Sequence, residues 1–540
     1  MEKNFNALCG IDEFGRTIMP YDSIDEKKKV GIFYFCWLGQ LGDKEIYDIE
    51  KLLKKDPESL WDVKGPDESP AWGFHYWGEP LYGYYNSEER FVIRKHIELL
   101  SAAGIDYILF DNTNAQIYPQ VILNIMEELE RYQKEGVKVP KVACYTNSGS
   151  VQTVQIIWEI FYKEKNLHPD VWYSPNGKPV IVATSDLETE DPKMYEFFDV
   201  WVSQWPNEKF SEKGLPWMEW TYPQPIHKGV VSVSVAQHAK GIFYTQKGNW
   251  GRGYDHEGND NHDTFRLGQN FQKQWDTAIN NEDVNEVFVT GWNEWGAQKL
   301  NLMGETGFCD CFSEEYSRDV EMMRGGYGDA FYMQMINNIR KFKKATPFTQ
   351  SAKMKEINIS EGLAQWDDVK NIYLPQTSDN YSRDSFAYDN KIHYHTDPAE
   401  NNITEVRVSH DKNNIYFLIK TENDITESRM RPGWMNVFIS AGTPKKQGWE
   451  GYKFVANRRC AGSLDELNCA GFTVSYAKTD YIIEKNTMQL VIPRDIIGAD
   501  ATEGFYFKVA DSVKDPFDIS EYYVSGSVLP AGRLSWYYKF

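Results

Sequence analysis

The stretch VTGWNEWGAQKL (residues 289–300) contains side chains that suit the chemistry of a sugar. A β-branched run leads to Trp292 and Trp295, which bracket Asn293 and Glu294. Indole faces stack on the C–H-rich faces of sugars, while amides and carboxylates bond sugar hydroxyls. A carboxylate in such a place can serve as base or nucleophile in glycosidic cleavage. The stretch predicts a sugar site with Glu294 as the first catalytic candidate; a strand-end Glu paired with an Arg is the alternative.

Glycosidic cleavage commonly needs a second carboxylate, and two positions could supply it. Asp111 ends the hydrophobic run of residues 106–112, where capping of the following helix is an equally good interpretation. Glu219 lies between Trp217 and Trp220, with a solvated loop residue as the alternative. The candidate substrate-binding residues lie at strand ends or in aromatic loops and are His75, Tyr76, Trp77, Asn112, Gln237, His238, Trp250, Trp292 and Asn293.

The elements that must position these residues alternate between strands and helices from residue 30 to about residue 344. The expected strands are short, rich in Val, Ile, Phe and Tyr, and mostly lack polar alternation, as strands buried on both faces do. They are residues 30–37, 106–112, 141–147, 178–185, 199–204, 217–222, 230–237 and 286–295. Eight such strands interleaved with helices predict a parallel (β/α)8 barrel of the TIM type. Since residues 199–204 and 217–222 are the weakest strands, seven strands or an open sheet remain alternatives.

The expected helices carry clear boundary signals. Asn86 is a candidate cap for a helix that ends at Gly104. Residues 120–136 and 266–279 predict further helices, and a helix from about Asp329 is expected to close the barrel.

Beyond residue 353 the pattern changes to antiparallel β structure. Residues 405–423 form two apolar runs around Asp411–Asn414, a hairpin signal, and residues 481–493 repeat that design. Residues 435–442 and 504–512 add strands, so we expect a β-sandwich. The predicted domains are a barrel at residues 1–345, a linker at 346–353 and the sandwich at 354–540.

The charge and hydropathy of the 540-residue chain exclude some classes of protein. A net charge of −21 argues against nucleic-acid binding, because phosphate contacts need clustered Lys and Arg. No apolar stretch approaches the length of a membrane span. The first ten residues lack the apolar core of a secretory leader. The protein is therefore expected in the cytoplasm or, if a leader has been removed and replaced by Met1, in the periplasm or at the cell surface. We expect a monomer.

Cysteine and metal signals are weak. The seven cysteines are too few and too scattered for a disulfide framework, although Cys460 and Cys469 are spaced for one bridge. The polar segment 249–263 is expected to be a long loop and contains the possible ligands His256, Glu257, Asp260, His262 and Asp263. That spacing fits neither the zinc-protease helix nor the calcium hand loop. We predict no required metal or cofactor, and a structural cation in this loop stays open.

Five motifs together resemble a known family: TGWNEW (290–295), HYWGEPLYGYY (75–85), SVSVAQH (232–238), NWGRGYDHEG (249–258) and EYSRDVEMMRGGYGD (315–329). They are similar to the family 99 glycoside hydrolases, the endo-α-mannosidases, and to related bacterial polysaccharide-locus barrels. The resemblance covers most of residues 28–344. It implies that Glu294 is the carboxylate that acts through the sugar 2-hydroxyl. The family's acid/base Glu, three residues later, is replaced here by Ala297.

The C-terminal region resembles family 9-like carbohydrate-binding modules. The residues that carry this likeness are WMNVFISAG (434–442), GWEGYKFVANR (448–458) and FYFKVADS (505–512). Trp434 and Trp449 are candidate sugar-binding rings, with core or turn positions as the alternative.

Together these observations predict a bacterial glycoside hydrolase that acts on a complex polysaccharide or glycan. Because of Ala297, its acid would come from Glu219 or Asp111. If no acid is present, the alternative is a non-catalytic glycan-binding protein that keeps the barrel groove. A scaffold that docks partner proteins through the sandwich is a third possibility.

Overall fold

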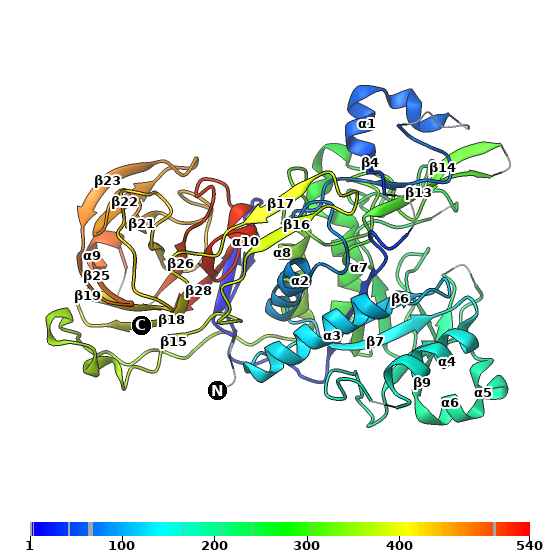
Figure 1. Cartoon of the computed structure of the whole chain (residues 1–540), viewed down its shortest axis with the longest axis horizontal. Coiled ribbons are helices and arrows are strands. Elements are labelled where there is room, and N and C mark those ends of the chain that lie inside the picture. Colours follow the sequence, from blue (N-terminus) through cyan, green and yellow to red (C-terminus); the bar gives the residue numbers. More distant parts are fainter. Residues whose placement is uncertain are drawn as a thin grey trace. The chain divides into compact units, whose positions relative to one another are not determined.

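The computed structural model describes residues 3, 5–41, 44–62, 68–164, 166–206, 208–239, 241–302, 304–499 and 504–540, and the chain divides into two compact units (Figure 1). The barrel unit comprises Asp25–Lys343 and Ser385–Tyr394. The β unit comprises Met1–Ile24, Lys344–Asp384 and His395–Phe540.

These units correct the predicted domain boundaries at the N-terminus and the linker. Met1–Ile24 belongs to the β unit because β1 (Leu8–Ile11) pairs with β28 (Leu534–Tyr538). The predicted linker, 346–353, is tied to the same unit: the Thr349 N–H donates to Asp22 Oδ2 at 3.0 Å. A strand contributed from the other end of the chain gives no local signal, so the sequence pattern missed it.

A hairpin within the predicted sandwich also changes unit. The hairpin consists of β16 (Arg383–Phe386), β17 (His393–Thr396) and the turn that joins them. Its central part, Ser385–Tyr394, groups with the barrel unit. There the Tyr388 hydroxyl donates to the Glu45 carbonyl at 2.6 Å, and the Tyr84 N–H donates to the Tyr394 hydroxyl at 2.9 Å.

The barrel unit is built on a nearly closed, parallel, eight-stranded sheet. In spatial order its strands are β10 (Gly214–Pro216), β9 (Asp199–Gln204), β8 (Val180–Ala183), β7 (Lys141–Thr146), β6 (Tyr107–Asn112), β3 (Lys29–Tyr34), β12 (Glu286–Val289) and β11 (Val230–Val233). Every neighbouring pair in this order is parallel. Across the remaining seam, the Ser232 hydroxyl of β11 donates to the Pro216 carbonyl of β10 at 2.8 Å.

This sheet confirms the predicted parallel barrel and corrects one strand. Residues 217–222 were expected to form a strand, but the strand is Gly214–Pro216, and residues 217–222 follow it as bends and irregular backbone. The interior is filled by Phe33, Leu109, Tyr145 and Phe288, among others.

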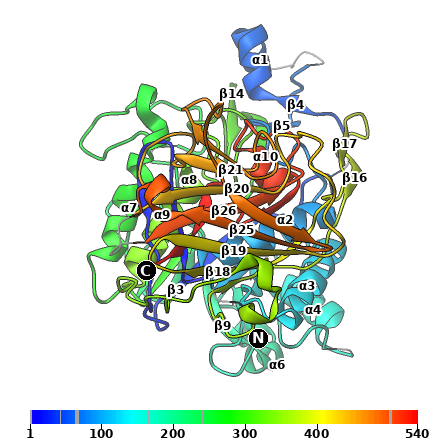
Figure 2. The ribbon, with the colours of Figure 1, turned by 90° about the vertical axis from the view of Figure 1, so that its left-hand side faces the viewer.

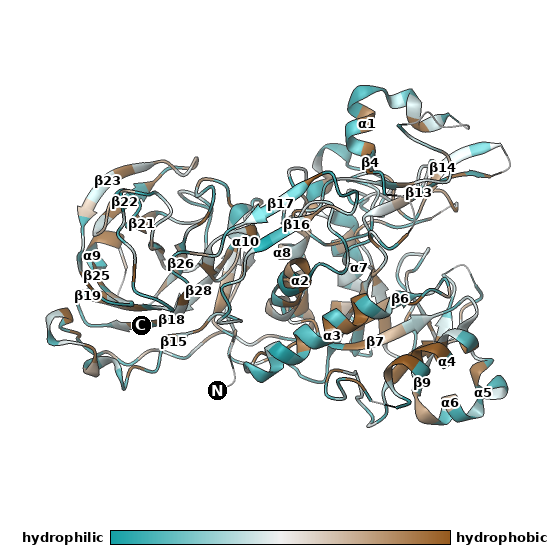
Figure 3. Cartoon of the chain, in the orientation of Figure 1, coloured by the Kyte–Doolittle hydropathy of each residue, from teal (hydrophilic) through white to brown (hydrophobic). Residues whose placement is uncertain are grey.

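Helices connect most of the barrel strands. They are α1 (Ile49–Lys55), α2 (Arg90–Ala103), α3 (Pro119–Lys134), α4 (Ser150–Phe161), α5 (Leu187–Glu190), α6 (Pro192–Phe197), α7 (Gln269–Ile279) and α8 (Ala330–Phe342), with short 3₁₀ turns at Pro57–Trp61 and His262–Leu267. No described helix lies between β9 and β11, so the alternation of strand and helix is incomplete there. In Figure 3, α3 shows both hydrophobic and hydrophilic residues along its length, as expected of a helix with one buried face.

The predicted helix end at Gly104 is confirmed, because this residue has φ 85° and caps α2. The predicted N-cap is wrong. Glu89 is the N-cap, and Asn86 instead accepts hydrogen bonds from the Glu88 N–H at 2.9 Å and from the Gln40 side chain.

A small sheet contains the two strands that follow the catalytic candidate, Glu294, in sequence. Its order is β14 (Glu305–Cys309), β13 (Gly296–Leu302), β5 (Phe74–Tyr76) and β4 (Tyr47–Asp48). Gly296 is the first residue of β13. Only glycine fits at this position, because a Cβ there would lie 2.0 Å from the ring of Trp37. The half-buried Trp37 therefore lies directly beside the chain two residues after Glu294.

The β unit contains a nine-stranded and a five-stranded sheet, and every described strand pair in these two sheets is antiparallel. The nine strands are β1, β2 (Thr17–Ile18), β20 (Asn436–Ala441), β21 (Phe454–Ala456), β22 (Ser463–Leu467), β23 (Thr473–Lys478), β26 (Phe505–Asp511), β27 (Ser527–Leu529) and β28. The five are β15 (Ile372–Tyr373), β18 (Ile403–His410), β19 (Asn414–Thr421), β24 (Asp480–Glu484) and β25 (Thr487–Pro493). Several members of both sheets are visible in Figure 2.

Side chains of the two sheets meet in a shared core, and short helical turns complete the unit. Phe417 of β19 contacts Phe505 and Phe507 of β26, with ring centroids 6.1 and 5.3 Å apart. The remaining turns are Ile359–Glu361, Ala364–Trp366, α9 (Arg494–Ile497) and α10 (Glu521–Val524). Both predicted hairpins are confirmed, as β18–β19 and β24–β25.

Two further observations concern the whole chain. All seven cysteines are free, so the proposed bridge between Cys460 and Cys469 is not formed, and both thiols are exposed. Within the described residues, no helix has the length and apolar character needed to cross a membrane.

Candidate active site

Glu294 and Asp111 both lie at the carboxyl-terminal end of the barrel. Asp111 lies within the last two residues of β6, and Glu294 follows β12. His238 follows β11, which neighbours β12. Because the strands are parallel, these three side chains gather at one end of the sheet, the end where barrel proteins place their functional groups.

Glu294 is almost completely buried, and the polar contacts of its side chain and N–H come from residues 311–319. Arg318 Nη2 donates to Glu294 Oε2 at 2.6 Å, and the Glu294 N–H donates to Asp319 Oδ1 at 2.9 Å. The thiol of Cys311 lies 3.9 Å from Glu294 Oε2 and 3.8 Å from Asp319 Oδ2. The arginine partner considered as the alternative for Glu294 is therefore present.

The charge balance around this ion pair is unusual, because several carboxyl groups surround Arg318. Asp310 Oδ1 lies 3.6 Å from the same Arg318 nitrogen, and 45% of the Asp310 side chain is exposed. Burial raises the pKa of Glu294 well above its ordinary value; Arg318 lowers it, and Asp310, Asp319 and Asp111 raise it further. The acids of this group compete for Arg318. We call Glu294, Asp310, Asp319, Asp111 and Arg318 the Glu294 cluster.

Two other acids of the cluster also have raised pKa values. Burial raises the pKa of Asp319 to about 6, against the opposing effects of the Glu294 N–H and Arg318. Burial likewise raises the pKa of Asp111, although hydrogen bonds from the Thr113 N–H and hydroxyl, at 3.0 and 2.7 Å, lower it. Burial therefore disfavours the charged form of three carboxyl groups in the Glu294 cluster, so the cluster retains protons to a higher pH than free carboxyl groups do.

Aromatic rings border the cluster. His238 is buried with its ring 4.2 Å from that of Tyr244 and 5.1 Å from that of Trp220. Burial, reinforced by Arg318, lowers the pKa of His238 to about 3, so this imidazole is neutral. Trp220 and Trp37 are both half-buried against the top of the barrel interior. Each keeps part of its side chain exposed.

The predicted stacking of Trp77 and Trp292 on a sugar is corrected by the structure, because both side chains are completely buried. Trp77 stacks on Trp295 with centroids 4.0 Å apart, and Trp77 Nε1 donates to the Glu294 carbonyl at 2.8 Å. Trp292 packs edge to face against His96, with centroids 5.5 Å apart. Rings without an exposed face hold the strand end in place and offer no surface to a sugar.

The predicted contact of Asn293 with substrate is also corrected, because its amide bonds the backbone of Phe35. Its Oδ1 accepts from the Phe35 N–H at 2.9 Å, and its Nδ2 donates to the Phe35 carbonyl at 3.1 Å. The buried amide thus extends the β3–β12 pairing by one side chain and has no free group for a substrate hydroxyl.

Glu219 lies apart from the Glu294 cluster. Its Oε1 is 2.6 Å from His227 Nε2, and His227 Nδ1 is 2.9 Å from the Ser211 carbonyl. Burial raises the pKa of Glu219, while His227 lowers it, and no acid of the Glu294 cluster contributes to that shift. Glu219 is therefore the weaker candidate for the second carboxylate.

Four other predicted substrate-binding residues are buried and make internal contacts. His75 lies 3.0 Å from the Ser69 hydroxyl, and burial lowers its pKa to about 4. Tyr76 stacks on Tyr388 with centroids 5.6 Å apart. Both side chains are buried, as are the amides of Gln237 and Asn112.

Gln237 and Asn112 form local hydrogen bonds. Gln237 Nε2 donates to the Thr221 carbonyl at 2.9 Å and its Oε1 accepts from Gln274 at 2.5 Å; Asn112 Nδ2 donates to the Gln116 carbonyl at 2.7 Å. Trp250 is half-buried and stacks on Tyr254 with centroids 5.4 Å apart.

In the β unit, Trp434 and Trp449 are both buried, which corrects their assignment as sugar-binding rings. Trp434 Nε1 donates to the Thr426 carbonyl at 2.9 Å, and Trp449 packs on Phe438 with centroids 5.5 Å apart. Both therefore occupy the core positions considered as the alternative.

Sequence reasoning missed Arg318, Asp319, Asp310 and Cys311. The signal available was the charged run SRDVE, residues 317–321. Charges so placed are either solvated or paired, and burial decides between the two. Glu294, Cys311 and Asp319 offer three ligand atoms within 4.8 Å of one another. The Arg318 guanidinium already bound to Glu294 opposes a second cation there.

The fold and site define an α/β barrel with a buried acid–base cluster at the carboxyl end of its strands. No protein-family model matches the chain, and no curated protein matches it significantly. Among solved structures, the GH99 endo-α-mannosidase from Bacteroides thetaiotaomicron is similar, with 15% identity, a TM-score of 0.35 and coverage of 60% of this chain and 99% of that one.

A second structure of that mannosidase, in complex with bis-tris propane, has 14% identity and a TM-score of 0.33, and covers 59% of this chain and 98% of that one. Likenesses at this level assign neither family nor activity.

Proposed function

We propose that the barrel unit hydrolyses glycosidic bonds of a polysaccharide or glycan at the Glu294 cluster. The observation that carries the proposal is the group of buried carboxyl groups with raised pKa values around Arg318, next to half-buried tryptophans at the carboxyl end of a parallel barrel. Glycoside hydrolysis needs one carboxylate and one protonated carboxyl group close together, and a cluster that holds a shared proton supplies both forms.

Within this mechanism Glu294 acts in its carboxylate form, which the ion pair with Arg318 favours against burial, as base or nucleophile toward the sugar. Asp111 supplies the proton to the leaving oxygen, because burial favours its protonated form and it shares the end of the barrel with Glu294. Trp220 and Trp37 offer exposed faces for stacking, and neutral His238 offers polar contact beside Trp220.

The test is a screen of α- and β-linked plant, host and microbial glycans with the full chain. For a glycan that is cleaved, Asp111→Asn should slow natural substrates strongly while largely sparing substrates with activated leaving groups, which need no acid. Asp310→Asn is the comparison, since Asp310 lies 3.6 Å from Arg318, which also lowers the pKa of Asp111, and is far more exposed than Asp111. If only Asp310→Asn shows that selective rescue, Asp310 is the acid and Asp111 is not.

A non-catalytic glycan-binding protein is the second candidate function. The observation that favours it is Ala297, which is buried in β13 and paired with His75 of β5, so no carboxyl group occupies the position of the family 99 acid. Tight binding of a glycan that the protein never cleaves would establish this alternative and reject hydrolysis.

A further inference from the structure

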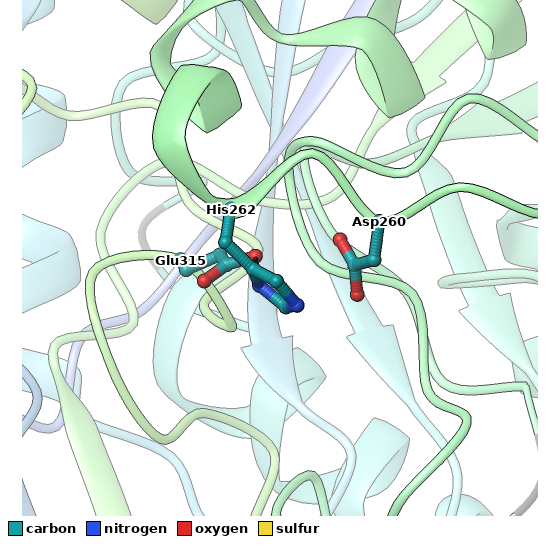
Figure 4. A group of neighbouring side chains, drawn as sticks. All are labelled: Asp260, His262 and Glu315. Atoms are coloured by element: carbon teal, nitrogen blue, oxygen red, sulfur yellow. Dashed lines mark hydrogen bonds and ion pairs between the residues drawn. The ribbon is translucent and has the colours of Figure 1, made fainter.

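Two loops of the barrel unit bring together an imidazole and two carboxyl groups outside the Glu294 cluster. Asp260 and His262 come from the loop predicted at residues 249–263, and Glu315 comes from the segment between β14 and α8 (Figure 4). One nitrogen of His262 and one oxygen from each acid lie within 4.8 Å of one another. Of the five loop residues considered from sequence, two take part, and the third member lies more than fifty residues further along the chain.

The hydrogen bonds of this group leave one buried oxygen unused. His262 Nδ1 lies 2.7 Å from Glu315 Oε1, and the Tyr316 hydroxyl donates to Asp260 Oδ2 at 2.8 Å. The other oxygen of Asp260, Oδ1, is buried and has no hydrogen-bond partner among the described residues. Buried carboxylate oxygens normally accept hydrogen bonds. An oxygen without a partner, in a group with two other side chains that can bind a metal, points to a bound ion as the partner.

Electrostatics favours a cation at the same place. Burial raises the pKa of Glu315; the hydrogen bond with His262 lowers it, and the neighbouring Asp260 raises it again. Two carboxylates this close repel each other, and a divalent ion between them replaces repulsion by attraction.

We propose that Asp260, His262 and Glu315 bind a divalent metal ion of the zinc class. An imidazole combined with carboxylates suits Zn²⁺, whereas Ca²⁺ and Mg²⁺ prefer oxygen ligands throughout. Bonds of about 2.0–2.2 Å to a tetrahedral ion place its ligand atoms roughly 3.4 Å apart. The three ligand atoms lie within 4.8 Å of one another, so side-chain rotations would be needed to bring all three to bonding distance of one ion. The exposed side of His262 leaves the fourth position to water.

The ion would join two segments that hold the Glu294 cluster in place. The Arg252 N–H donates to the Glu315 carbonyl at 3.0 Å, and Arg252 Nη2 donates to the Ser317 hydroxyl at 2.6 Å and to the Asp319 carbonyl at 3.0 Å. Arg318 lies inside this bonded stretch. A metal on Glu315 therefore fixes the backbone that presents Arg318 to Glu294, which makes it a structural ion.

The experiment measures Zn²⁺ binding to the full, tag-free chain by calorimetry after removal of metals with chelator. We expect one ion per chain, and His262→Ala and Asp260→Asn should each weaken binding by about a hundredfold or more, since even outer-shell partners cost ten- to a hundredfold. Circular dichroism verifies that these variants remain folded. Zn²⁺ should also slow proteolysis of the 249–263 loop in the parent but not in the variants.

Two controls decide the location of the ion. His395→Ala removes a histidine of comparable exposure, 53% against 61%, whose Nε2 lies 3.0 Å from Asp397 Oδ1. It should bind Zn²⁺ like the parent. Cys311→Ser tests the other ligand group, Glu294, Cys311 and Asp319. The proposal is overturned if the parent binds no Zn²⁺, if His262→Ala and Asp260→Asn bind it normally, or if Cys311→Ser alone abolishes binding.

Discussion

Glu294 and Glu321 are two buried glutamates of the same barrel unit whose surroundings differ sharply. Glu321 accepts hydrogen bonds from the Tyr85 hydroxyl at 2.7 Å and from Trp295 Nε1 at 2.6 Å, and its other oxygen lies 2.9 Å from His96 Nε2. It is completely buried. Glu294 keeps slight exposure, binds an arginine and is surrounded by other acids.

The difference separates a structural carboxylate from a reactive one. Around Glu321 the partners are a hydroxyl, an indole N–H and an imidazole nitrogen, so both of its oxygens have hydrogen-bond partners. Around Glu294 several acids compete for Arg318, so protons redistribute when pH or a ligand changes. Trp292 and Trp295 pack with the structural group around Glu321, through His96 and through Glu321 itself. Trp220 and His238 contact each other beside the Glu294 cluster.

The largest expected effect is on turnover when Glu294 loses its ionisable group. Glu294→Gln keeps the shape of the side chain, so glycan affinity should change little. On a verified substrate, kcat should fall by about a thousandfold, because the group acts on the transition state. Steady-state kinetics together with calorimetric glycan binding measure both quantities.

Glu321→Gln is the matched control. The amide cannot accept from all three donors, so we expect lower stability, by about 2 to 4 kcal/mol in urea unfolding, with kcat of the folded protein within about threefold of the parent. Full activity in Glu294→Gln, or a thousandfold loss in Glu321→Gln, would reverse the comparison.

The next effect concerns Trp292, which packs against His96 in the structural group around Glu321. Trp292→Ala leaves a cavity and should destabilise the barrel unit by about 3 kcal/mol, toward the low end for such changes because His96 and Tyr332 can relax into the space. Trp292→Phe should cost less. Urea unfolding measures the loss. An unchanged unfolding midpoint with a raised KM would show instead that Trp292 meets substrate.

The sequence predicted those parts of the fold that depend on local pattern. Unbroken apolar runs marked seven of the eight barrel strands, and Gly104 marked a helix end. The strand at Gly214–Pro216 was missed because three residues, one of them proline, carry no recognisable period. The placement of Met1–Ile24 was missed because pairing between chain ends leaves no trace in neighbouring residues.

For the site, residue type was a better guide to chemistry than to exposure. Glu294 and Asp111 do share one electrostatic cluster, since strand-end carboxylates of a parallel sheet meet at one edge. Asn293 and Trp292, adjacent to Glu294, are both completely buried, because Asn293 bonds the Phe35 backbone and Trp292 packs against His96. Sequence reasoning could not tell which face each would take, nor that Arg318 would fold back onto Glu294.

A smaller effect is expected in the pH dependence of stability. Burial raises the pKa of Asp319 to about 6, above its unfolded value. The folded state therefore binds more protons between about pH 4 and pH 6, and stability falls as pH rises through this window, by about 2 to 3 kcal/mol.

Asp319→Asn can still accept from the Glu294 N–H and should remove most of that decline. Urea midpoints at a series of pH values measure the slope in parent and variant. An equal slope in both would mean that Asp319 is not the group that titrates, and would place the shared proton elsewhere in the Glu294 cluster.

The smallest expected effect is on Trp220, the half-buried ring assigned to the Glu294 side. Its ring contacts His238 and its Nε1 lies 3.4 Å from the Met218 sulfur, so part of the side chain packs while one face stays open. If that face stacks on a sugar, Trp220→Ala should raise KM by about tenfold, which corresponds to about 1.4 kcal/mol, and leave kcat within a few-fold. Trp220→Phe retains a flat ring and should recover most of the affinity.

Because the side chain of Trp220 is only partly packed, the loss of stability in Trp220→Ala should be well below that in Trp292→Ala. A large drop in stability with an unchanged KM would place Trp220 with Trp292 in the core, and would remove the sugar-facing ring from the site while leaving the acid–base assignment of Glu294 to its own test.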